Sequence, residues 1–334
     1  MRILINSPVV YPILADMHYA GIERLGMEYA QGLAKLGHSV SLTCAPGSIS
    51  LDGIELIICL QGGAEAEQVA YPIYADKLEG FDAILDLSHF HAPAMNKPNL
   101  PALNVFWHDP LLAKYPEPSY NILAISQYAK RNFELIYEQS AYYQEIIEVD
   151  PTVYYPAQAF LLPPSRFLAA GRMGVDKGQL EAMRICRKLD APLDVVGASG
   201  QGDPTDYENL VRRFATGDIC FWGNCLDEEK IKLMQSCKAL IYPVAQVEIH
   251  SHKSVEAMFC GAPVIAYNIG AMEEVVGSAG RVVNTEEEFI SAMLTADSIS
   301  RRYCREYSTA RWSRNKVIPE ISKLLEEVAG GKRW

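Results

Sequence analysis

The chain has 334 residues, more than a single domain usually contains, so we expect two domains of about 150 residues each. Hydrophobic residues make up 49% of the chain and charged residues 21%, as in ordinary globular proteins. The net charge of −11 argues against general nucleic-acid binding, which needs a basic face.

Short apolar runs alternate with helix-like patterns along the chain, as in parallel α/β folds. The opening MRILINSPVV reads as a first strand, not as a signal peptide, because it has one basic residue and no small-residue cleavage site. Strands are expected at 2–6, 40–43, 55–59, 83–87, 103–107, 122–125, 167–170, 193–196, 219–222, 239–242 and 264–267. The proline-rich segment 149–165 between the two sets predicts an interdomain connector.

Two helices have clear sequence signals. After Gly21, apolar residues recur at steps of three and four as far as Leu36, and Gly37 is expected to end that helix. In the second half, Asp176 is expected to cap a helix, with Gln179 three residues further on. Each helix follows a strand and a glycine-bearing loop, so the sequence predicts two doubly wound domains in tandem. Ligands of such sheets bind beyond the carboxyl ends of the strands.

The stretch AAGRMGVDKGQLEA, residues 169–182, predicts an anion site at the start of a helix. Free backbone N–H groups and the helix dipole favour an anion there, and Arg172 and Lys177 add charge enough for a diphosphate. The stretch matches neither GxGxxG nor a Walker A loop. A solvated helix start with two surface cations remains the alternative.

The stretch VEIHSHKSVEAMFCGAPVIAY, residues 247–267, contains two glutamates separated by seven residues. Ser251 is expected to cap a helix over roughly 252–260, which Gly261 closes. Glu256 would lie within this helix and Glu248 in the loop before it, so both can face one ligand. Carboxylates accept hydrogen bonds well from vicinal hydroxyls, as on a ribose or a hexose. Two surface glutamates are the alternative.

These two stretches, in this order, resemble the motifs of the retaining glycosyltransferase family 4 (glycosyl transferases group 1, GT-B fold). The block at 247–266 is similar to ExFGxxxxEAMAxGxPVIA, and GRMGVDKG to the GRxxxxKG donor loop. The N-terminal AGIERLGMEYAQGLAKLGHSV resembles the family's GGxE loop and following helix, and VFWHD its strand ending in a histidine. The resemblance covers almost the whole chain.

The resemblance implies the GT-B fold, with two Rossmann-like domains facing a central cleft. Its expected parts are an acceptor-side domain at 1–156, a nucleotide-sugar-binding domain at 157–310 and a helix at 311–334 that returns to the N-terminal domain. It also implies a metal-independent reaction that needs no cofactor besides its donor, a UDP-, GDP- or ADP-sugar. The acceptor stays open: a glycan, a lipid or a small metabolite.

The resemblance also implies roles for single residues. Arg172 and Lys177 would hold the donor diphosphate, Glu256 the ribose hydroxyls and Glu248 the hydroxyls of the transferred sugar. Three further residues would complete the site: Gly21 close to the phosphate through its backbone N–H, the loop from Gly223 around the base, and His108 near the reacting face of the sugar.

The sequence departs from the family pattern at two places. Ile249-His250-Ser251 stands where the family has Gly-Phe-Gly, which leaves the sugar's identity open, and Ala20 stands where the family has the first glycine of its pair. Two alternative functions remain: a sugar-nucleotide 2-epimerase of the same fold, whose pattern lacks this block of glutamates, and a non-catalytic protein that binds a nucleotide sugar.

Other polar clusters have simpler explanations. His89-x-His91 and His250-x-His252 could suggest a metal, or they could be polar histidines at strand ends and in loops. His108-Asp109 could be a base with its orienting acid, or a helix-starting aspartate beside a histidine at the edge of the core. The basic and aromatic stretch 301–316 could contact an anionic membrane surface, or it could be the solvated face of C-terminal helices. The eight cysteines include no CxxC pair, so we expect buried free thiols in a cytoplasmic protein. The sequence contains no run of 18 apolar residues, so we expect no membrane-spanning helix.

Overall fold

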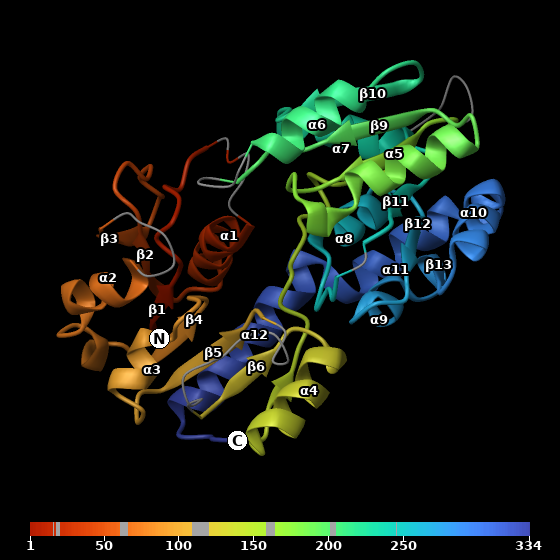
Figure 1. Cartoon of the computed structure of the whole chain (residues 1–334). Coiled ribbons are helices and arrows are strands. Elements are labelled where there is room, and N and C mark those ends of the chain that lie inside the picture. The colour runs from red at the N-terminus through yellow and green to blue at the C-terminus, as the bar shows by residue number, and fades with distance from the viewer. Residues whose placement is uncertain are drawn as a thin grey trace. The chain divides into compact units, whose positions relative to one another are not determined.

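The computed structural model describes residues 1–15, 17, 21–60, 66–108, 120–157, 164–200, 205–244 and 246–334 (Figure 1). The chain forms two compact units, the first made of Met1–Glu148 with Arg314–Trp334, and the second of Val149–Ser313. The sequence placed the boundaries at 156/157 and 310/311, whereas the units divide at 148/149 and 313/314.

Backbone contacts explain why the segment after residue 148 belongs to the second unit. The Val149 N–H donates to the Trp312 carbonyl at 2.9 Å, and Val149 also pairs with Ser313 in an isolated parallel bridge. Arg305 donates to the carbonyl of Pro151 at 3.0 Å. Proline density alone could not indicate these contacts. Pro163, which was part of the expected connector, lies outside the described residues.

In the first unit, the described strands form one parallel sheet in the order β3-β2-β1-β4-β5-β6-β7. Apolar residues buried on both faces give these strands their continuous hydrophobic runs. The strands are β1 (Arg2–Asn6), β2 (Ser39–Cys44), β3 (Ile54–Ile58), β4 (Ala83–Asp86), β5 (Ala102–Phe106), β6 (Ile122–Ala124) and β7 (Tyr142–Tyr143).

The helices of the first unit are α1 (Gly21–Lys35), α2 (Ala66–Tyr74), η1 (Leu78–Gly80), α3 (Ala92–Asn96), α4 (Gln127–Tyr137) and α12 (Arg314–Ala329). The predicted helix after Gly21 is confirmed, with Gly37 left-handed just past its end. The C-terminal α12 packs against α1, β4 and β5, as expected of a helix that returns to the N-terminal domain (Figure 1). A β-carbon on Gly32 would lie 3.0 Å from the Ile318 side chain, so this glycine allows α1 and α12 to approach closely.

In the second unit, the described strands form a parallel sheet in the order β10-β9-β8-β11-β12-β13. They are β8 (Phe167–Ala170), β9 (Leu193–Val196), β10 (Ile219–Gly223), β11 (Leu240–Tyr242), β12 (Val264–Tyr267) and β13 (Gly280–Val283). The sequence missed β13, which begins with a glycine, and β7 of the first unit, which has only two residues. A β-carbon at Gly280 would lie 2.0 Å from the Val264 carbonyl oxygen, so this strand requires its glycine.

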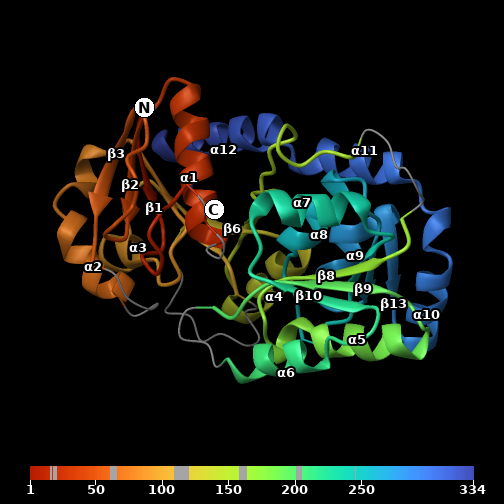
Figure 2. The same cartoon turned by 90° about the horizontal axis from the view of Figure 1, so that it is seen from above.

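The helices of the second unit cover both faces of its sheet. They are η2 (Val175–Lys177), α5 (Gln179–Lys188), α6 (Asp206–Phe214), α7 (Asp227–Ser236), α8 (His252–Phe259), α9 (Met272–Val276), η3 (Gly277–Ala279), α10 (Glu286–Leu294), η4 (Ala296–Ser298) and α11 (Arg301–Trp312). Figure 2 shows α5 and α6 on one side of β8, β9 and β10, and α7 and α8 on the other. This is the doubly wound arrangement that the sequence predicted.

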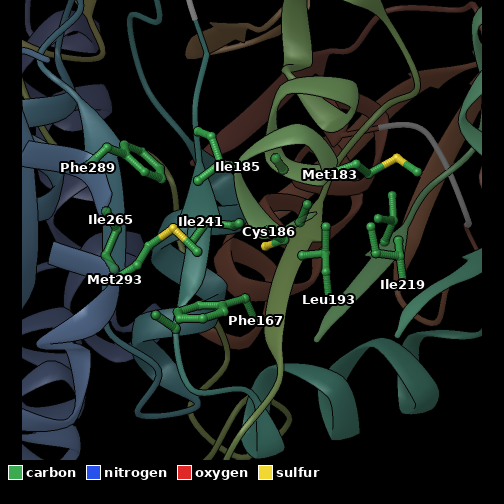
Figure 3. Close-up of a cluster of buried hydrophobic side chains, with 14 of the residues drawn as sticks. Phe167, Met183, Ile185, Cys186, Leu193, Ile219, Ile241, Ile265, Phe289 and Met293 are labelled. Carbon is green, nitrogen blue, oxygen red and sulfur yellow. The ribbon is translucent and has the colours of Figure 1, made fainter. Parts of the chain in front are cut away.

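A hydrophobic core fills the space between this sheet and helices α5 and α10. Phe167 from β8 and Ile241 from β11 meet Cys186 from α5 and Phe289 from α10, all at most 4% exposed (Figure 3). At about 25 cal/mol per Å² of apolar surface, such side chains supply most of the unit's stability. The core fixes the strands whose carboxyl ends form the site described below.

In the basic stretch at 301–316, Arg301 and Arg305 bind main-chain carbonyls at the ends of helices. Arg301 donates to the Gln235 and Cys237 carbonyls, at the end of α7. Arg305 donates to the Phe259 carbonyl, at the end of α8. Cationic side chains at these helix ends satisfy carbonyls that no helical N–H reaches. Arg302 is the exposed arginine of this turn and pairs with Glu306.

The cysteines are free thiols, as expected, but two of them are not buried. All eight cysteines are free thiols; six are buried, Cys225 is half-buried and Cys220 is exposed. Within the described ranges, every helix falls short of the length and apolar character needed to span a bilayer.

Candidate functional site

The expected donor residues of the second unit gather at the carboxyl ends of its parallel strands. Arg172 follows β8, Gly223 ends β10, and Glu248 follows β11. Glycines at this edge allow the backbones to come together: the Gly197 N–H donates to the Gly223 carbonyl at 2.9 Å, and a β-carbon on Gly197 would meet the Gly171 oxygen at 1.8 Å. Ligands of doubly wound sheets bind at this edge.

The loop between β8 and α5 is tighter than the sequence indicated. The predicted cap by Asp176 is wrong, because α5 begins at Gln179 and its N-cap is the left-handed Gly178. Asp176 instead accepts a hydrogen bond from Arg172 at 2.7 Å within a 3₁₀ turn. A β-carbon on Gly178 would lie 2.6 Å from the Pro243 carbonyl oxygen. Glycine at this position therefore lets the cationic loop lie against the segment that follows β11.

Lys177 and Glu248 are brought together, although 71 positions separate them in the sequence. The Lys177 ammonium donates to Glu248 Oε1 and lies 3.5 Å from an oxygen of Asp176. Tyr242, at the end of β11, donates its hydroxyl to the same Oε1 at 3.0 Å. The sequence analysis missed Tyr242, whose only signal is an aromatic residue at the end of an apolar strand before Pro243.

Glu256 lies on α8, whose predicted start is confirmed because the Ser251 side chain accepts from the Ser254 N–H. Its carboxylate accepts from the Lys253 ammonium at 3.0 Å and lies 3.8 Å from that of Lys230. Burial by itself raises the pKa of Glu256, but the attraction of Lys230 and Lys253 outweighs burial and holds the pKa at about 2. Glu256 is therefore ionised at neutral pH.

Lys230 is a buried cation that the sequence analysis also missed. It lies on α7, is 9% exposed, and pairs with Asp227 at 2.7 Å as well as with Glu256. The sequence of α7, DEEKIKLMQS, has no local signal that distinguishes Lys230 from a surface lysine, and its contact with Glu256 comes from the fold. The pair keeps a charged carboxylate inside the protein, which is costly unless it is compensated.

His250 packs as an aromatic side chain in the interior of the second unit. It is 7% exposed, and neither ring nitrogen has a hydrogen-bond partner in the part of the chain that the structure describes. Its ring meets that of Trp312 edge to face at 6.1 Å between centroids. Burial, with the nearby charge of Arg311, lowers the pKa of His250 to about 3. The neutral imidazole thus fills the position at which the resembled family has phenylalanine.

Replacing His250 with phenylalanine is expected to make the protein less sensitive to acid. The unfolded chain takes up this proton near pH 6.5 and the folded protein near pH 3, so between these values the unfolded state binds more protons. The free energy of unfolding therefore falls as the pH is lowered through this window, by up to ~1.4 kcal/mol per unit from this group. Urea unfolding at about pH 5 and about pH 7.5 measures it: His250→Phe should lose less stability between the two than wild type by about 2 kcal/mol. Equal losses in both proteins would contradict this account.

The expected site residues of the first unit also lie at the carboxyl ends of strands or at a helix start. Gly21 begins α1, is exposed, and a β-carbon there would have no described residue within 4 Å. His108 follows β5, and its Nε2 is joined to Nδ1 of His89 by a hydrogen bond of 3.1 Å. Asp109, expected as the orienting acid of His108, lies outside the described residues, as does Ala20.

Buried acids support the His89 segment, and sequence reasoning missed them. Glu67 on α2 accepts from the backbone N–H groups of His89 and Phe90 at 2.8 and 3.0 Å. Burial raises the pKa of Glu67 to about 8, against the lowering by these two N–H groups. Asp86 is fully buried at the end of β4, where its carboxylate accepts from Asn6 at 2.9 Å. Among the described residues, no group of three or more side chains could hold a metal ion.

Comparison with known proteins finds similarity to one family over part of the chain. Residues 164–296 match the family described as Glycosyl transferases group 1. A stretch of 139 residues, 40% of the chain, is 30% identical to the O-antigen chain mannosyltransferase B of Escherichia coli, of which the match spans 36%. The chain thus matches just over a third of the length of that curated relative.

Solved structures show the same fold over the whole chain. The sucrose-phosphate synthase of Thermosynechococcus elongatus is similar with a TM-score of 0.82 at 16% identity, covering 99% of this chain and all of its own. AviGT4, a glycosyltransferase involved in avilamycin A biosynthesis, gives 0.75 at 18% identity over 100% and 99% of the two chains. Anabaena Alr3699/HepE, solved in complex with UDP and glucose, gives 0.73 at 15% identity over 98% and 100%. Residues 164–296 are therefore similar to the group 1 glycosyl transferases, and the chain has the GT-B fold.

Proposed function

We propose that this protein is a retaining, metal-independent glycosyltransferase, of the family 4 type, that moves a hexose-type sugar from a nucleotide-diphosphate sugar to an acceptor hydroxyl. The observation that carries the proposal is the contact of Lys177 with Glu248 at the carboxyl edge of the second sheet. In this contact, the ammonium group of Lys177, which would bind the diphosphate, lies beside the carboxylate of Glu248, which would bind the sugar hydroxyls.

The donor would bind along this edge through groups of different charge. Arg172 and Lys177 would hold the diphosphate, and the ionised Glu256 would accept from the ribose hydroxyls. The backbone from Gly223 would hold a uracil, guanine or adenine base. Support comes from Alr3699/HepE, a protein of the same fold whose structures contain UDP, UDP and glucose, or UDP-glucose.

The bond from the sugar to the diphosphate would break with its charge on the phosphate oxygens. Arg172 and Lys177 would stabilise this developing charge, and Glu248 would keep the sugar oriented for attack. The departing phosphate would accept the proton of the acceptor hydroxyl on the same face, which preserves the anomeric configuration without a covalent intermediate. His108 would contact the sugar near its reacting carbon.

The acceptor is proposed as a glycan, lipid or small-metabolite hydroxyl. Free thiols fit a reducing compartment, so we propose that the protein acts in the cytoplasm. A lipid-linked acceptor would bring it to the membrane surface as a peripheral protein.

The first test is turnover of sugar nucleotides in the presence of EDTA. A thermal-shift screen of UDP-, GDP- and ADP-sugars identifies the donor, because a ligand at a hundredfold excess over its Kd stabilises the folded state by ~2.7 kcal/mol. Transfer should continue in EDTA, because Arg172, Lys177 and the start of α5 already supply positive charge. Loss of activity that Mn²⁺ or Mg²⁺ restores would contradict metal independence.

The same reaction tests the stereochemistry. An α-linked donor should give an α-linked product, which the NMR signal of the anomeric proton reports. A β-linked product would contradict a retaining mechanism. Release of the nucleotide diphosphate with a free, epimerised sugar would instead identify a 2-epimerase.

A further inference from the structure

We propose that Tyr242 is a positioning residue that leaves only one oxygen of Glu248 available to the sugar, and so sets the selectivity for the sugar hydroxyl that this oxygen accepts. The inference rests on the proposed function and deepens it, because it assigns sugar discrimination to a contact outside the pattern of the two glutamates.

The hydrogen bonds of Glu248 are divided unequally between its two oxygens. Oε1 accepts from both the Tyr242 hydroxyl, at 3.0 Å, and the Lys177 ammonium. Oε2 accepts no hydrogen bond from the described residues. It is also absent from the buried polar atoms that have no partner, so it is exposed to solvent. The carboxylate therefore presents one saturated oxygen and one that a ligand can reach.

The backbone of Glu248 is fixed as well. Its carbonyl accepts from the Ala271 N–H at 2.7 Å, and a β-carbon on Gly270 would lie 2.2 Å from the same oxygen, so only glycine fits against it. The remaining freedom of Glu248 lies in its side-chain torsions. Two donors on Oε1 restrict these torsions, so Oε2 would be held in place before the sugar arrives, as preorganised binding requires.

Tyr242 is suited to this role because it stays a donor. It is 6% exposed at the end of β11. Burial, and then the negative charge of Glu248, raise the pKa of Tyr242 well above its ordinary value. The phenol therefore keeps its proton at neutral pH, and it continues to donate its hydrogen bond to Oε1.

A single fixed acceptor has a chemical consequence for specificity. A site built to accept from one hydroxyl rejects the analogue that lacks it, because the carboxylate is then left without a partner. If Glu248 could rotate, either oxygen could serve and a hydroxyl at a neighbouring position could substitute. Tyr242 would thus sharpen discrimination between a sugar and its deoxy analogues or epimers, with little effect on nucleotide binding.

The test is Tyr242→Phe, which keeps the ring and removes the hydroxyl. The probes are UDP-glucose, GDP-mannose and ADP-glucose, then the 2-, 3-, 4- and 6-deoxy forms of the one that binds best. For the variant we expect kcat/KM with the intact donor to fall about tenfold, and the preference over the most strongly rejected deoxy form to fall by a similar factor. The Kd of the matching nucleotide diphosphate should change less than about twofold.

Tyr267→Phe is the matched control. Tyr267 ends the neighbouring strand β12, and its hydroxyl makes no hydrogen bond within the described part of the chain. This variant should match wild type in every measurement, and both variants should unfold within a few degrees of wild type.

Calorimetric titration separates this inference from the proposed function. The ratio of the Kd values of intact donor and nucleotide diphosphate reports the sugar contact even without turnover. A wild-type protein that binds donors but transfers no sugar contradicts the proposed function. In that case the inference is still supported if Tyr242→Phe binds the intact donor with a smaller preference over its deoxy form than wild type does. Unchanged discrimination in Tyr242→Phe overturns the inference whether or not the wild type is active. Failure of every sugar nucleotide to bind overturns both.

Discussion

Replacing Lys177 with alanine is expected to lower kcat/KM for the sugar nucleotide by about 10²–10³-fold, as when one preorganised donor to a developing anion is removed. The Lys177 ammonium lies against Glu248 and 3.5 Å from Asp176, in a side chain that is 23% exposed. A partly shielded cation interacts more strongly with a departing diphosphate than a fully solvated one. Steady-state kinetics with the donor identified by thermal shift measures the effect.

Lys188→Ala is the control for Lys177→Ala. Lys188 ends α5, is 58% exposed, and pairs with Glu286 on the surface, so its removal should leave the kinetics unchanged. Similar losses in both variants would show that general charge, rather than the position of Lys177, attracts the donor.

Lys177 could also act only by orienting Glu248, and a double-mutant cycle separates the two roles. If Lys177 acts only through the carboxylate, Lys177→Ala should cost nothing further in a Glu248→Ala background. If it contacts the diphosphate, most of its effect should persist there. It should also weaken binding of the nucleotide diphosphate alone, which carries no sugar for Glu248 to hold.

The sequence could predict the elements whose signals are local. The apolar run of β1 and the helical periodicity after Gly21 depend on nearby residues, and both appear where expected. Ser251 caps α8 because a serine side chain satisfies a free N–H three residues on. Lys177 and Glu248 are far apart in the sequence, but they follow strands that end at the same edge of a parallel sheet. The sheet topology therefore brings them close together.

The features that sequence reasoning missed depend on contacts between distant segments. Asp176 looks like a helix cap, but Gly178 must lie against the Pro243 carbonyl and takes that position instead. Lys230 is an ordinary surface lysine by composition, and only the fold places Glu256 beside it. His250 could have been a metal ligand or a polar loop histidine, whereas packing against Trp312 leaves it buried and neutral. Such outcomes require the tertiary structure.

The two glutamates of the 247–267 segment should differ in what they bind. If Glu256 holds the ribose, Glu256→Ala should weaken binding of the bare nucleotide diphosphate as much as that of the full donor. If Glu248 holds only the sugar, Glu248→Ala should leave nucleotide affinity near normal while kcat/KM falls. A hydrogen bond to a charged group contributes ~1.5–3 kcal/mol, so each effect should be about ten- to hundredfold.

Titration of both variants with nucleotide diphosphate and with intact donor measures this division. Glu256→Ala needs a further control, because among the described residues it leaves the buried Lys230 paired with Asp227 alone. The double variant Glu256→Ala with Lys230→Met removes that excess charge. Nucleotide affinity that stays low in the double variant points to the lost carboxylate, whereas recovered affinity points to the charge of Lys230.

The surroundings of the two carboxylates give the physical reason to expect this division. Glu256 lies between two ammonium groups that keep it ionised, and it belongs to a helix packed into the second unit. It can therefore accept from hydroxyls that are present in donor and product alike. Glu248 is held through Oε1 by Lys177 and Tyr242, and its other oxygen would contact the sugar. That contact would be lost once the sugar is transferred. A residue that contacts only the transferred group should act on kcat/KM and leave the nucleotide diphosphate's Kd unchanged. Equal behaviour of the two variants in both titrations would contradict this division of roles.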